Sequence, residues 1–452
     1  MTQASIFLHL LFLTINLPDI VMLLLGGGCA FVLAYMLTFA VGAFCRKVGW
    51  LDRPAARRVH NKAVPRLGGV AIFLAFLIAS LLFYNPGPSL NPHAHEVTIY
   101  WLLIAAGALM VLVHAYDDVM GLKPWAKLLA QTVAVIVILA PLGREFNGIL
   151  LFTFNNPFGR DIVQHGAPWY LQPTFFLIVH DTTIRLAAIP AVLFTWFWIT
   201  GMMNTVNLID GLDGLAAGVV AIAALFITII SFILQQYSIA ILSAIFTGAV
   251  LGFLPHNWNP AKIFMGDSGA MFLGLGLAVL SIMGGAKIAL AFTVLGVPIL
   301  DVAVVMINRI RRGQSPLHYD KTHLHYRLMA TGLSTRQICY VFYGLTFMFG
   351  LLALGLPRIF KFVGILLLLL TMAALVYWID YRQRQRGVQI KLGGPDPEPK
   401  GGDEEPPDAG AGDDRQDAPS AYGWGTAGDH KGPPIHPTPR SPLRIDRLQR
   451  RR

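Results

Sequence analysis

Charged residues are scarce in this chain: Asp, Glu, Lys and Arg make up 13% of its 452 residues, and hydrophobic residues make up 55%. Soluble domains usually carry about 25% charged residues, so this chain has too little polar surface to cover a water-soluble body of its size. Cysteine is scarce too. The three cysteines stand in or beside apolar runs, which excludes a disulfide framework and a CxxC metal site. The composition therefore excludes a soluble enzyme.

Long apolar runs are what the chain has instead. A membrane-spanning helix needs roughly 17–25 mostly apolar residues, and eleven segments qualify. They are residues 19–45, 67–84, 97–115, 126–142, 186–206, 214–234, 237–254, 269–285, 288–306, 338–356 and 360–380. The sequence thus predicts an all-α polytopic membrane protein with about eleven transmembrane helices.

Lys and Arg are distributed unevenly among the connecting loops. When the N-terminus is placed outside, the loops that face the cytoplasm hold 16 basic residues, counting Lys127 at a helix mouth, and the opposite loops hold 6. The positive-inside rule favours this orientation, which puts the C-terminus in the cytoplasm.

Two segments fall outside the predicted spans. Residues 143–185 form the longest external connection, and their apolar runs around NNPFG predict a short β-hairpin or a surface helix. Residues 385–452 are rich in Gly, Pro and charge and cannot bury a core, so we expect a disordered cytoplasmic tail. The remaining residues, 1–384, then form the integral membrane domain that carries any catalytic site.

Ionisable residues at the mouths of the spans are functional candidates, because the bilayer makes them costly. Asp117 and Asp118 end the third span, and Lys127 begins the fourth. Adjacent carboxylates repel each other, so the pair implies a bound cation, a protonated member or simple solvation. The neighbouring lysine favours a functional pair over a hydrated helix end.

The segment NTVNLIDGLDG is a second polar group. Its members Asn204, Asn207, Asp210 and Asp213 recur at i, i+3 spacing, which places neighbouring pairs on the same side of a helix. The glycines that follow the two aspartates would let a ligand approach the backbone. Four oxygen donors in an otherwise apolar helix predict a binding site.

A third candidate is Asp267, which precedes Ser268 at the start of the eighth span. A helix N-terminus with nearby glycines favours bound anions, although an ordinary N-cap aspartate explains the position equally well.

Basic and histidine side chains gather in two predicted cytoplasmic loops. The last loop contains Arg311, Lys321, His323 and His325. A His-x-His pair could bind zinc, but no third ligand stands nearby, and the surrounding cations favour phosphate. The first loop contributes Lys62 and Arg66, although ordinary positive-inside charge explains most of that loop.

Together these residues predict one chemistry. Carboxylates and asparagine suit a hard, oxygen-preferring cation, and Mg²⁺ is usually held by one or two carboxylates plus substrate phosphates. The basic residues suit those phosphates, whose charge the metal neutralises during phosphoryl transfer. We therefore expect a membrane-embedded phosphoryl-transfer site on the cytoplasmic face.

The same residues resemble, in order, the motifs of the polyprenyl-phosphate N-acetylhexosamine-1-phosphate transferase superfamily. The similarity covers roughly residues 19–380 and includes DD near the third span, NxxNxxDGxDGLAxG, GDxG and a histidine-containing last loop. It implies an enzyme of the bacterial inner membrane that transfers a sugar-1-phosphate from a UDP-N-acetylhexosamine to undecaprenyl phosphate and releases UMP. It implies Mg²⁺ as the cofactor, with Mn²⁺ as the alternative.

The resemblance also implies roles on the donor side. Asp267 matches the aspartate that binds Mg²⁺, and Asn207 is the candidate second contact. Asp213 matches a position close to the uracil. Asp210 belongs to the same nucleotide pocket, and Asn204 precedes it in the motif.

On the acceptor side, Asp117 and Asp118 match the carboxylates near the lipid phosphate, and His323 and His325 match the loop that contacts the diphosphate. These four are the catalytic candidates. Asp117 could deprotonate the acceptor or act as a covalent nucleophile, and we prefer the single displacement.

The histidine loop favours one branch of the superfamily. Translocases that load phospho-MurNAc-pentapeptide carry three consecutive histidines, whereas this loop reads HLHYRL, which favours the GlcNAc-1-phosphate transferases. Tyr326 departs from the second histidine of that branch. The alternatives are the pentapeptide translocase, a membrane transporter and a scaffold that works through its tail. The expected partners are the lipid bilayer and the two substrates, with a homodimer left open and no nucleic acid.

Overall fold

The computed structural model describes residues 17–52, 63–84, 95–142, 145–146, 148–150, 153–155, 177–179, 183–186, 188–283, 288–311, 313, 322–355 and 361–387. The chain divides into Met1–Glu398 and Pro399–Arg452, and every described residue belongs to the first unit. The predicted tail lies outside the described residues after position 387, so its disorder stays a prediction.

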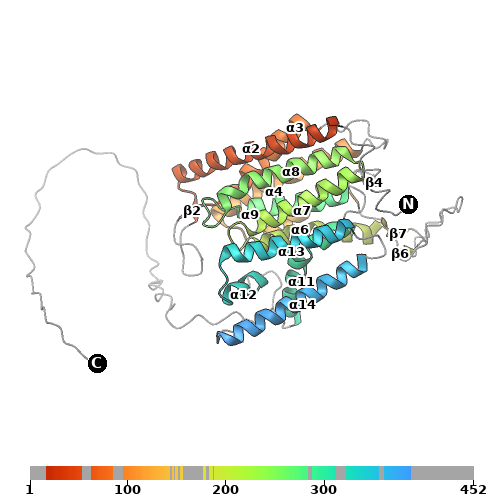
Figure 1. Ribbon diagram of the computed structural model, residues 1–452. Helices are drawn as coiled ribbons and strands as arrows, with labels where there is room; N and C mark the ends of the chain where they lie inside the picture. The colour runs from red at the N-terminus through yellow and green to blue at the C-terminus, as the bar shows by residue number, and fades with distance from the viewer. Residues whose placement is uncertain are drawn as a thin grey trace, which may run out of the picture. The chain divides into compact units, whose positions relative to one another are not determined.

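The described chain is dominated by helices (Figure 1). They are α2 (Leu17–Val48), α3 (Gly68–Phe83), α4 (His95–Met120), α5 (Pro124–Leu139), α6 (Ala188–Ile209), α7 (Leu215–Ile233), α8 (Tyr237–Asn257), α9 (Gly266–Met283), α10 (Ile288–Val294), α11 (Gly296–Arg311), α12 (Leu324–Ala330), α13 (Thr335–Gly355) and α14 (Lys361–Gln385). Within the described ranges, 8 helices are long and apolar enough to cross a membrane. The predicted all-α polytopic fold is confirmed.

One predicted span is broken. Residues 288–306 form two helices, α10 and α11, with Leu295 between them. Pro298 lies in the first turn of α11 and has no amide hydrogen to donate to the carbonyl of Val294, four residues earlier. A proline is tolerated in a first turn, so the helix restarts there instead of running on.

Short strands complete the described fold. Between α5 and α6, β5 (Thr153–Asn155), β6 (Leu177–Val179) and β7 (Thr183–Leu186) form an antiparallel sheet in the order β5-β7-β6. Strands β5 and β6 come from the two apolar runs on either side of NNPFG, but each pairs with β7 and not with the other, so among the described residues the predicted hairpin between these runs does not form. Two further pairs join β1 (Leu51–Asp52) to β2 (Val64–Pro65) and β3 (Pro141–Leu142) to β4 (Glu145–Phe146).

Helix α9 lies at the centre of the bundle, with almost every side chain buried. Small residues allow its neighbours to come close: a Cβ atom on Gly69 of α3 would lie 2.1 Å from the backbone nitrogen of Gly269. Helix α6 approaches as closely, since a Cβ on Gly274 would lie 2.4 Å from Cα of Met203. These contacts fix where the N-terminal end of α9 sits against α3.

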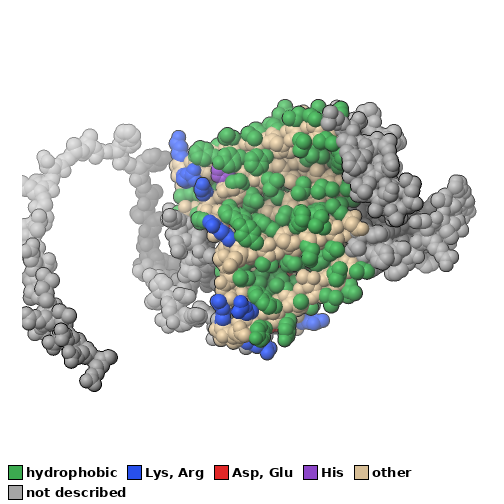
Figure 2. All heavy atoms as spheres, viewed as in Figure 1, with side chains coloured by type: hydrophobic (Ala, Val, Ile, Leu, Met, Phe, Trp, Pro, Cys, Tyr) green, Lys and Arg blue, Asp and Glu red, His purple; other side chains and the backbone are tan. Residues whose placement is uncertain are grey.

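The outer face of the bundle is apolar. Figure 2 shows hydrophobic side chains over most of the visible helices, with Lys and Arg side chains mainly toward one end. Large hydrophobic residues such as Leu82, Leu112 and Phe197 are about two-thirds exposed, at 67%, 71% and 68%. Contact with lipid explains this exposure, because proteins surrounded by water rarely expose so large an apolar surface.

Candidate active site

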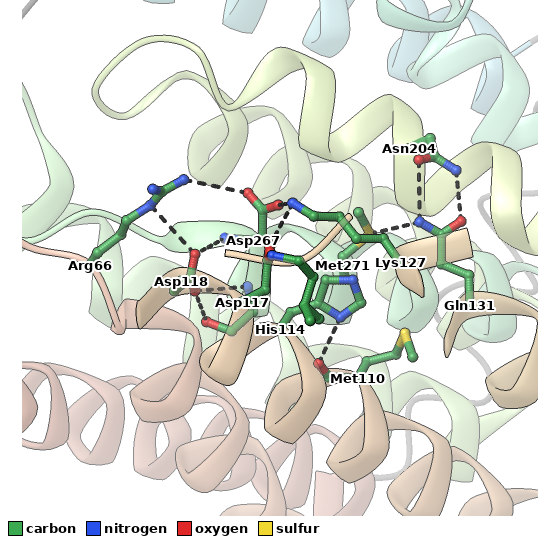
Figure 3. Close-up of polar contacts among 12 residues, drawn as sticks. Arg66, Met110, His114, Asp117, Asp118, Lys127, Gln131, Asn204, Asp267 and Met271 are labelled. Atoms are coloured by element: carbon green, nitrogen blue, oxygen red, sulfur yellow. Dashed lines mark hydrogen bonds and ion pairs between the residues drawn. The ribbon is translucent and has the colours of Figure 1, made fainter. Parts of the chain in front are cut away.

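Three helix ends meet at Lys127. Its Nζ atom lies 2.6 Å from Oδ2 of Asp117 and 2.7 Å from Oδ2 of Asp267 (Figure 3). Asp117 stands near the end of α4, Lys127 in the first turn of α5 and Asp267 in the first turn of α9. Gly121, at φ +75°, turns the chain between α4 and α5, and the Leu122 amide donates to Asp117 Oδ1 at 2.6 Å. The structure thus brings three predicted residues together.

Asp118 holds the beginning of α9. Its Oδ1 accepts the Asp267 amide at 2.8 Å, and its Oδ2 accepts the Ser268 amide at 3.1 Å and the Ser268 hydroxyl at 2.8 Å. The Asp118 carboxylate is fully buried. Charge-assisted bonds to helix N-terminal amides are strong, so Asp118 fixes the backbone that carries Asp267.

Arg66 approaches the same carboxylates from the segment before α3. Its Nε lies 3.4 Å from Asp118, and its Nη2 lies 3.7 Å from Oδ1 of Asp267. Gly266, at φ +73°, permits this crowding, because a Cβ there would lie 2.3 Å from the Arg66 carbonyl oxygen and 2.4 Å from an Asp118 oxygen. Arg66 therefore lies beside the carboxylates of α4 and α9, and its contact with the substrate stays a prediction.

The motif NTVNLIDGLDG is only half helical, which corrects the prediction. Helix α6 ends at Ile209, and residues 210–214 form a turn. Gly214, at φ +82°, a conformation that favours glycine, stands at the N-cap of α7, where the next helix begins. Asn204 and Asn207 therefore lie on α6, whereas Asp210 and Asp213 lie in the turn.

Asp210 faces the carboxylate cluster. Burial and the neighbouring Asp267 carboxylate raise the pKa of Asp210 well above its usual range, and the Arg66 charge opposes that shift. Asn207 is half-buried one helical turn before it. Both therefore stay candidates for binding the donor near Asp267.

Asp213 and Asn204 have partners elsewhere in the protein. Asp213 Oδ2 accepts Nδ2 of Asn259 at 2.9 Å and the Ala261 amide at 3.0 Å, which ties the turn to the loop after α8. Asn204 donates Nδ2 to Oε1 of Gln131 at 2.9 Å, which joins α6 to α5. Both residues therefore connect neighbouring segments of the fold, in addition to any role in binding a ligand.

The histidine segment packs against the 210–214 turn. His323 Nδ1 lies 3.0 Å from Oδ2 of Asp301, and the His323 and His325 rings are parallel within 6° at a centroid separation of 6.0 Å. A Cβ on Gly211 would lie 2.5 Å from Nε2 of His325. Burial and the neighbouring His323 lower the pKa of His325 to about 3, so its ring is neutral at physiological pH.

Three predicted basic residues are not brought to the centre by the described structure. Arg311 ends α11 with an exposed side chain. Lys62 and Lys321 lie outside the described residues, so their assignment to the substrate stays a prediction.

Two buried residues of this region escaped the sequence interpretation. His114 lies one turn before Asp117, with Nδ1 3.0 Å from the Met110 carbonyl oxygen and the charges of Asp267, Asp117 and Lys127 within reach. Asp301 lies inside a predicted span, where any acid is a functional candidate. That rule finds Asp301 when it is applied within spans as well as at their mouths.

The donor set fits magnesium. Asp117, Asp118, Asp210 and Asp267 supply carboxylates against the two cations Lys127 and Arg66, and the Asp267 side chain is 18% exposed. In the described part of the chain, no three His, Cys, Asp or Glu residues are placed to hold a metal by themselves. Mg²⁺ commonly needs only one or two carboxylates, with substrate phosphates and water as the other ligands.

Comparison with known proteins identifies the family. Residues 100–285 match the family model described as glycosyl transferase family 4. A Bacillus subtilis protein named "probable undecaprenyl-phosphate N-acetylglucosaminyl 1-phosphate transferase" is 34% identical over 329 residues, which cover 71% of this chain and 81% of that protein.

Two further relatives cover similar lengths. Decaprenyl-phosphate N-acetylglucosaminephosphotransferase of Mycobacterium tuberculosis is 31% identical over 346 residues, covering 71% of this chain and 79% of the relative. Phospho-N-acetylmuramoyl-pentapeptide-transferase of Bacillus cytotoxicus is 29% identical over 346 residues, which cover 74% of this chain and 97% of the relative. With its helical membrane fold and its cluster of carboxylates and cations, the chain belongs to the polyprenyl-phosphate N-acetylhexosamine-1-phosphate transferases.

Proposed function

We propose that this enzyme transfers GlcNAc-1-phosphate from UDP-GlcNAc to undecaprenyl phosphate, releasing UMP, at the cytoplasmic face of a bacterial inner membrane. The observation that carries the proposal is the Asp117–Lys127–Asp267 network at three adjoining helix ends. It combines a carboxylate suited to Mg²⁺ with a cation suited to phosphate at the ends of apolar helices.

Each residue of the network has a chemical task in this reaction. An oxygen of the lipid phosphate attacks the β-phosphorus of the donor, and the bond from that phosphorus to the UMP oxygen breaks. Lys127 and Arg66 bind phosphate oxygens, and Asp117 takes the proton of an acceptor that arrives protonated. Asp267, with Asn207 as the second contact, would hold Mg²⁺, which supplies charge neutralisation when bound.

The remaining residues position the donor. Asp210, beside Asp267, lines the nucleotide side, and His323 and His325 face the diphosphate. We favour one in-line displacement over a covalent intermediate on Asp117, because a lipid phosphate is already largely ionised near neutral pH and needs no activated protein nucleophile.

GlcNAc is favoured over phospho-MurNAc-pentapeptide. The relatives named for GlcNAc transfer are 34% and 31% identical, and the relative named for the pentapeptide is 29% identical. The histidine loop also lacks three consecutive histidines. A transporter is disfavoured, because ion pathways place acids near the bilayer midplane and Asp117 and Asp267 lie at helix ends.

One experiment tests the donor, the acceptor and the metal. Purified enzyme is incubated with undecaprenyl phosphate and a panel of UDP-sugars, and the mass of the lipid product and the released UMP are measured. We expect product with UDP-GlcNAc, loss of product with a chelator, and recovery with Mg²⁺ or Mn²⁺. Product from UDP-MurNAc-pentapeptide alone would instead assign the translocase activity, and ion-coupled flux without UMP would assign a transporter.

A further inference from the structure

Asp301 is a buried acid in α11 whose two oxygens bind one short segment. Its Oδ2 lies 3.0 Å from Nδ1 of His323, and its Oδ1 accepts the Leu324 amide at 3.0 Å. The residue is 1% exposed. A buried carboxylate is costly unless it is paired and hydrogen-bonded, and in the described structure both of its oxygens are engaged with the start of α12.

This geometry determines which nitrogen of His323 carries a hydrogen. An ionised carboxylate only accepts hydrogen bonds, so Nδ1 of His323 must be the donor. Nε2 is then the ring nitrogen that remains for a ligand. Because the Leu324 amide is bound to the same carboxylate, the ring and the first residue of α12 are held together.

His325 has no such partner. Its ring is 1% exposed, and neither ring nitrogen forms a hydrogen bond among the described residues. Its nearest described neighbours include Gly211 and the ring of Tyr326, whose centroid lies 4.2 Å away. The two histidines, although stacked in parallel, therefore have different environments, and only His323 is oriented by an acid.

A second anchor holds α12 without touching a histidine. Arg327 Nη2 lies 2.5 Å from Oδ1 of Asp380 in α14, and Gln383 Nε2 donates to the Arg327 carbonyl oxygen at 3.1 Å. These two contacts hold α12 in place and involve neither histidine ring. This anchor therefore provides a matched control for the role of Asp301.

We infer that Asp301 is a positioning residue that acts through His323, holding its Nδ1–H so that Nε2 is presented to the donor diphosphate. The inference rests on the proposed function, which gives the histidine segment its ligand. Carboxylates that orient a histidine through its other nitrogen recur in active sites, and their removal typically costs about 10- to 100-fold in activity or affinity.

A double-mutant cycle tests this coupling. The kcat and KM for the UDP-sugar are measured for wild type, Asp301→Asn, His323→Gln and the double variant. If Asp301 acts through His323, each single variant lowers kcat/KM by about 10- to 100-fold. The kcat/KM of the double variant then equals that of the less active single variant. The pair Asp380→Asn and His323→Gln should instead combine additively. Additive losses for Asp301 and His323 would overturn the inference.

A spectroscopic measurement tests the same point without turnover. Nitrogen-15 NMR of histidine-labelled wild type gives the His323 ring signals, assigned by their loss in His323→Gln. We expect Nδ1 protonated above pH 8, and a mixture of tautomers in Asp301→Asn. A wild-type His323 protonated on Nε2 alone would overturn the inference. Absence of UMP release with every UDP-sugar would refute the proposed function, and the NMR result would still decide the orientation of His323.

Discussion

Nζ of Lys127 lies 2.7 Å from Oδ2 of Asp267, although 140 residues separate them in the chain. The contact forms only when the first turns of α5 and α9 are packed together, so the active centre depends on the bundle. Asp117 completes the pair from α4 at 2.6 Å. One cation is thus shared by two carboxylates, and each carboxylate retains oxygen capacity for a metal or a proton.

Removing either carboxylate charge should abolish transfer. We expect Asp267→Asn and Asp117→Asn each to lower the rate of UMP release by about 10²-fold or more, since preorganised charges of this kind contribute that much to catalysis. The rate is measured in purified membranes with saturating Mg²⁺, and thermal unfolding verifies that each variant is folded. A folded Asp267→Asn variant with wild-type activity would contradict the proposed site.

The cap on α9 should be separable from the chemistry. Ser268→Ala removes one hydroxyl bond to Asp118 and should lower the free energy of unfolding by about 1 kcal/mol. Asp118→Asn weakens three bonds to a buried carboxylate and should cost more, about 1.5–3 kcal/mol. Denaturation in detergent measures both. A larger loss for Ser268→Ala than for Asp118→Asn would contradict the assignment of Asp118 as the anchor.

The contact between α3 and α9 should be intolerant of a methyl group. In Gly69→Ala the new Cβ would lie 2.1 Å from the Gly269 nitrogen, and overpacking of this kind costs about 1–3 kcal/mol. Because the contact holds the end of α9, the activity should fall as well. Gly201→Ala is the control, because a Cβ there meets nothing within 4 Å. Equal effects of the two substitutions would refute the prediction.

Acid should destabilise the protein through His325. Its pKa is about 3 in the folded state, against about 6.5 in an unfolded chain. Below pH 6.5 the unfolded state therefore binds a proton that the folded state does not, so the free energy of unfolding decreases as the pH is lowered. From pH 7 to pH 5 this residue should account for about 2 kcal/mol of lost stability.

Unfolding curves of wild type and His325→Gln at those two pH values measure the effect. The variant should lose less stability than wild type on acidification, and the two proteins should respond alike between pH 7.5 and pH 8.5. Identical losses at pH 5 would show that the His325 ring is not buried in its neutral form.

The C-terminal segment should be dispensable for turnover. Truncation after residue 387 keeps every residue of the described site and removes the Gly-, Pro- and charge-rich segment. We expect unchanged kcat and KM for the UDP-sugar in reconstituted liposomes. Loss of transfer by the truncated enzyme, with its helices still folded, would favour the scaffold hypothesis over catalysis in the membrane domain.

The sequence predicts the helices better than the turns, and the reason is physical. The length of an apolar run reports directly on a membrane span, so every predicted span except residues 288–306, which form α10 and α11, coincides with one helix. The break at Leu295, beside Pro298, and the turn from Ile209 to Gly214, where Gly214 adopts a positive φ, depend on local backbone conformation. A hydropathy pattern does not contain that information.

For the candidate site, the sequence predicts which residues take part but not how they are arranged in space. Asp117, Lys127 and Asp267 could be named from the sequence, because each is an ionisable group at the end of an apolar run. Their mutual distances could not, since they depend on the packing of α4, α5 and α9. The bond from Asp213 to Asn259 was likewise unpredictable, because nothing in an apolar pattern pairs a turn after α6 with a loop after α8.

The bond between Arg327 and Asp380 has a consequence for the order in which the enzyme is made. Asp380 belongs to α14, whose residues are among the last of the membrane domain to leave the ribosome. A chain arrested before that helix already contains Asp117, Lys127 and Asp267, yet the histidine helix still lacks its α14 anchor. Biosynthesis therefore leaves α12 without this contact until α14 has been made, so the histidine segment becomes fully anchored only late in synthesis.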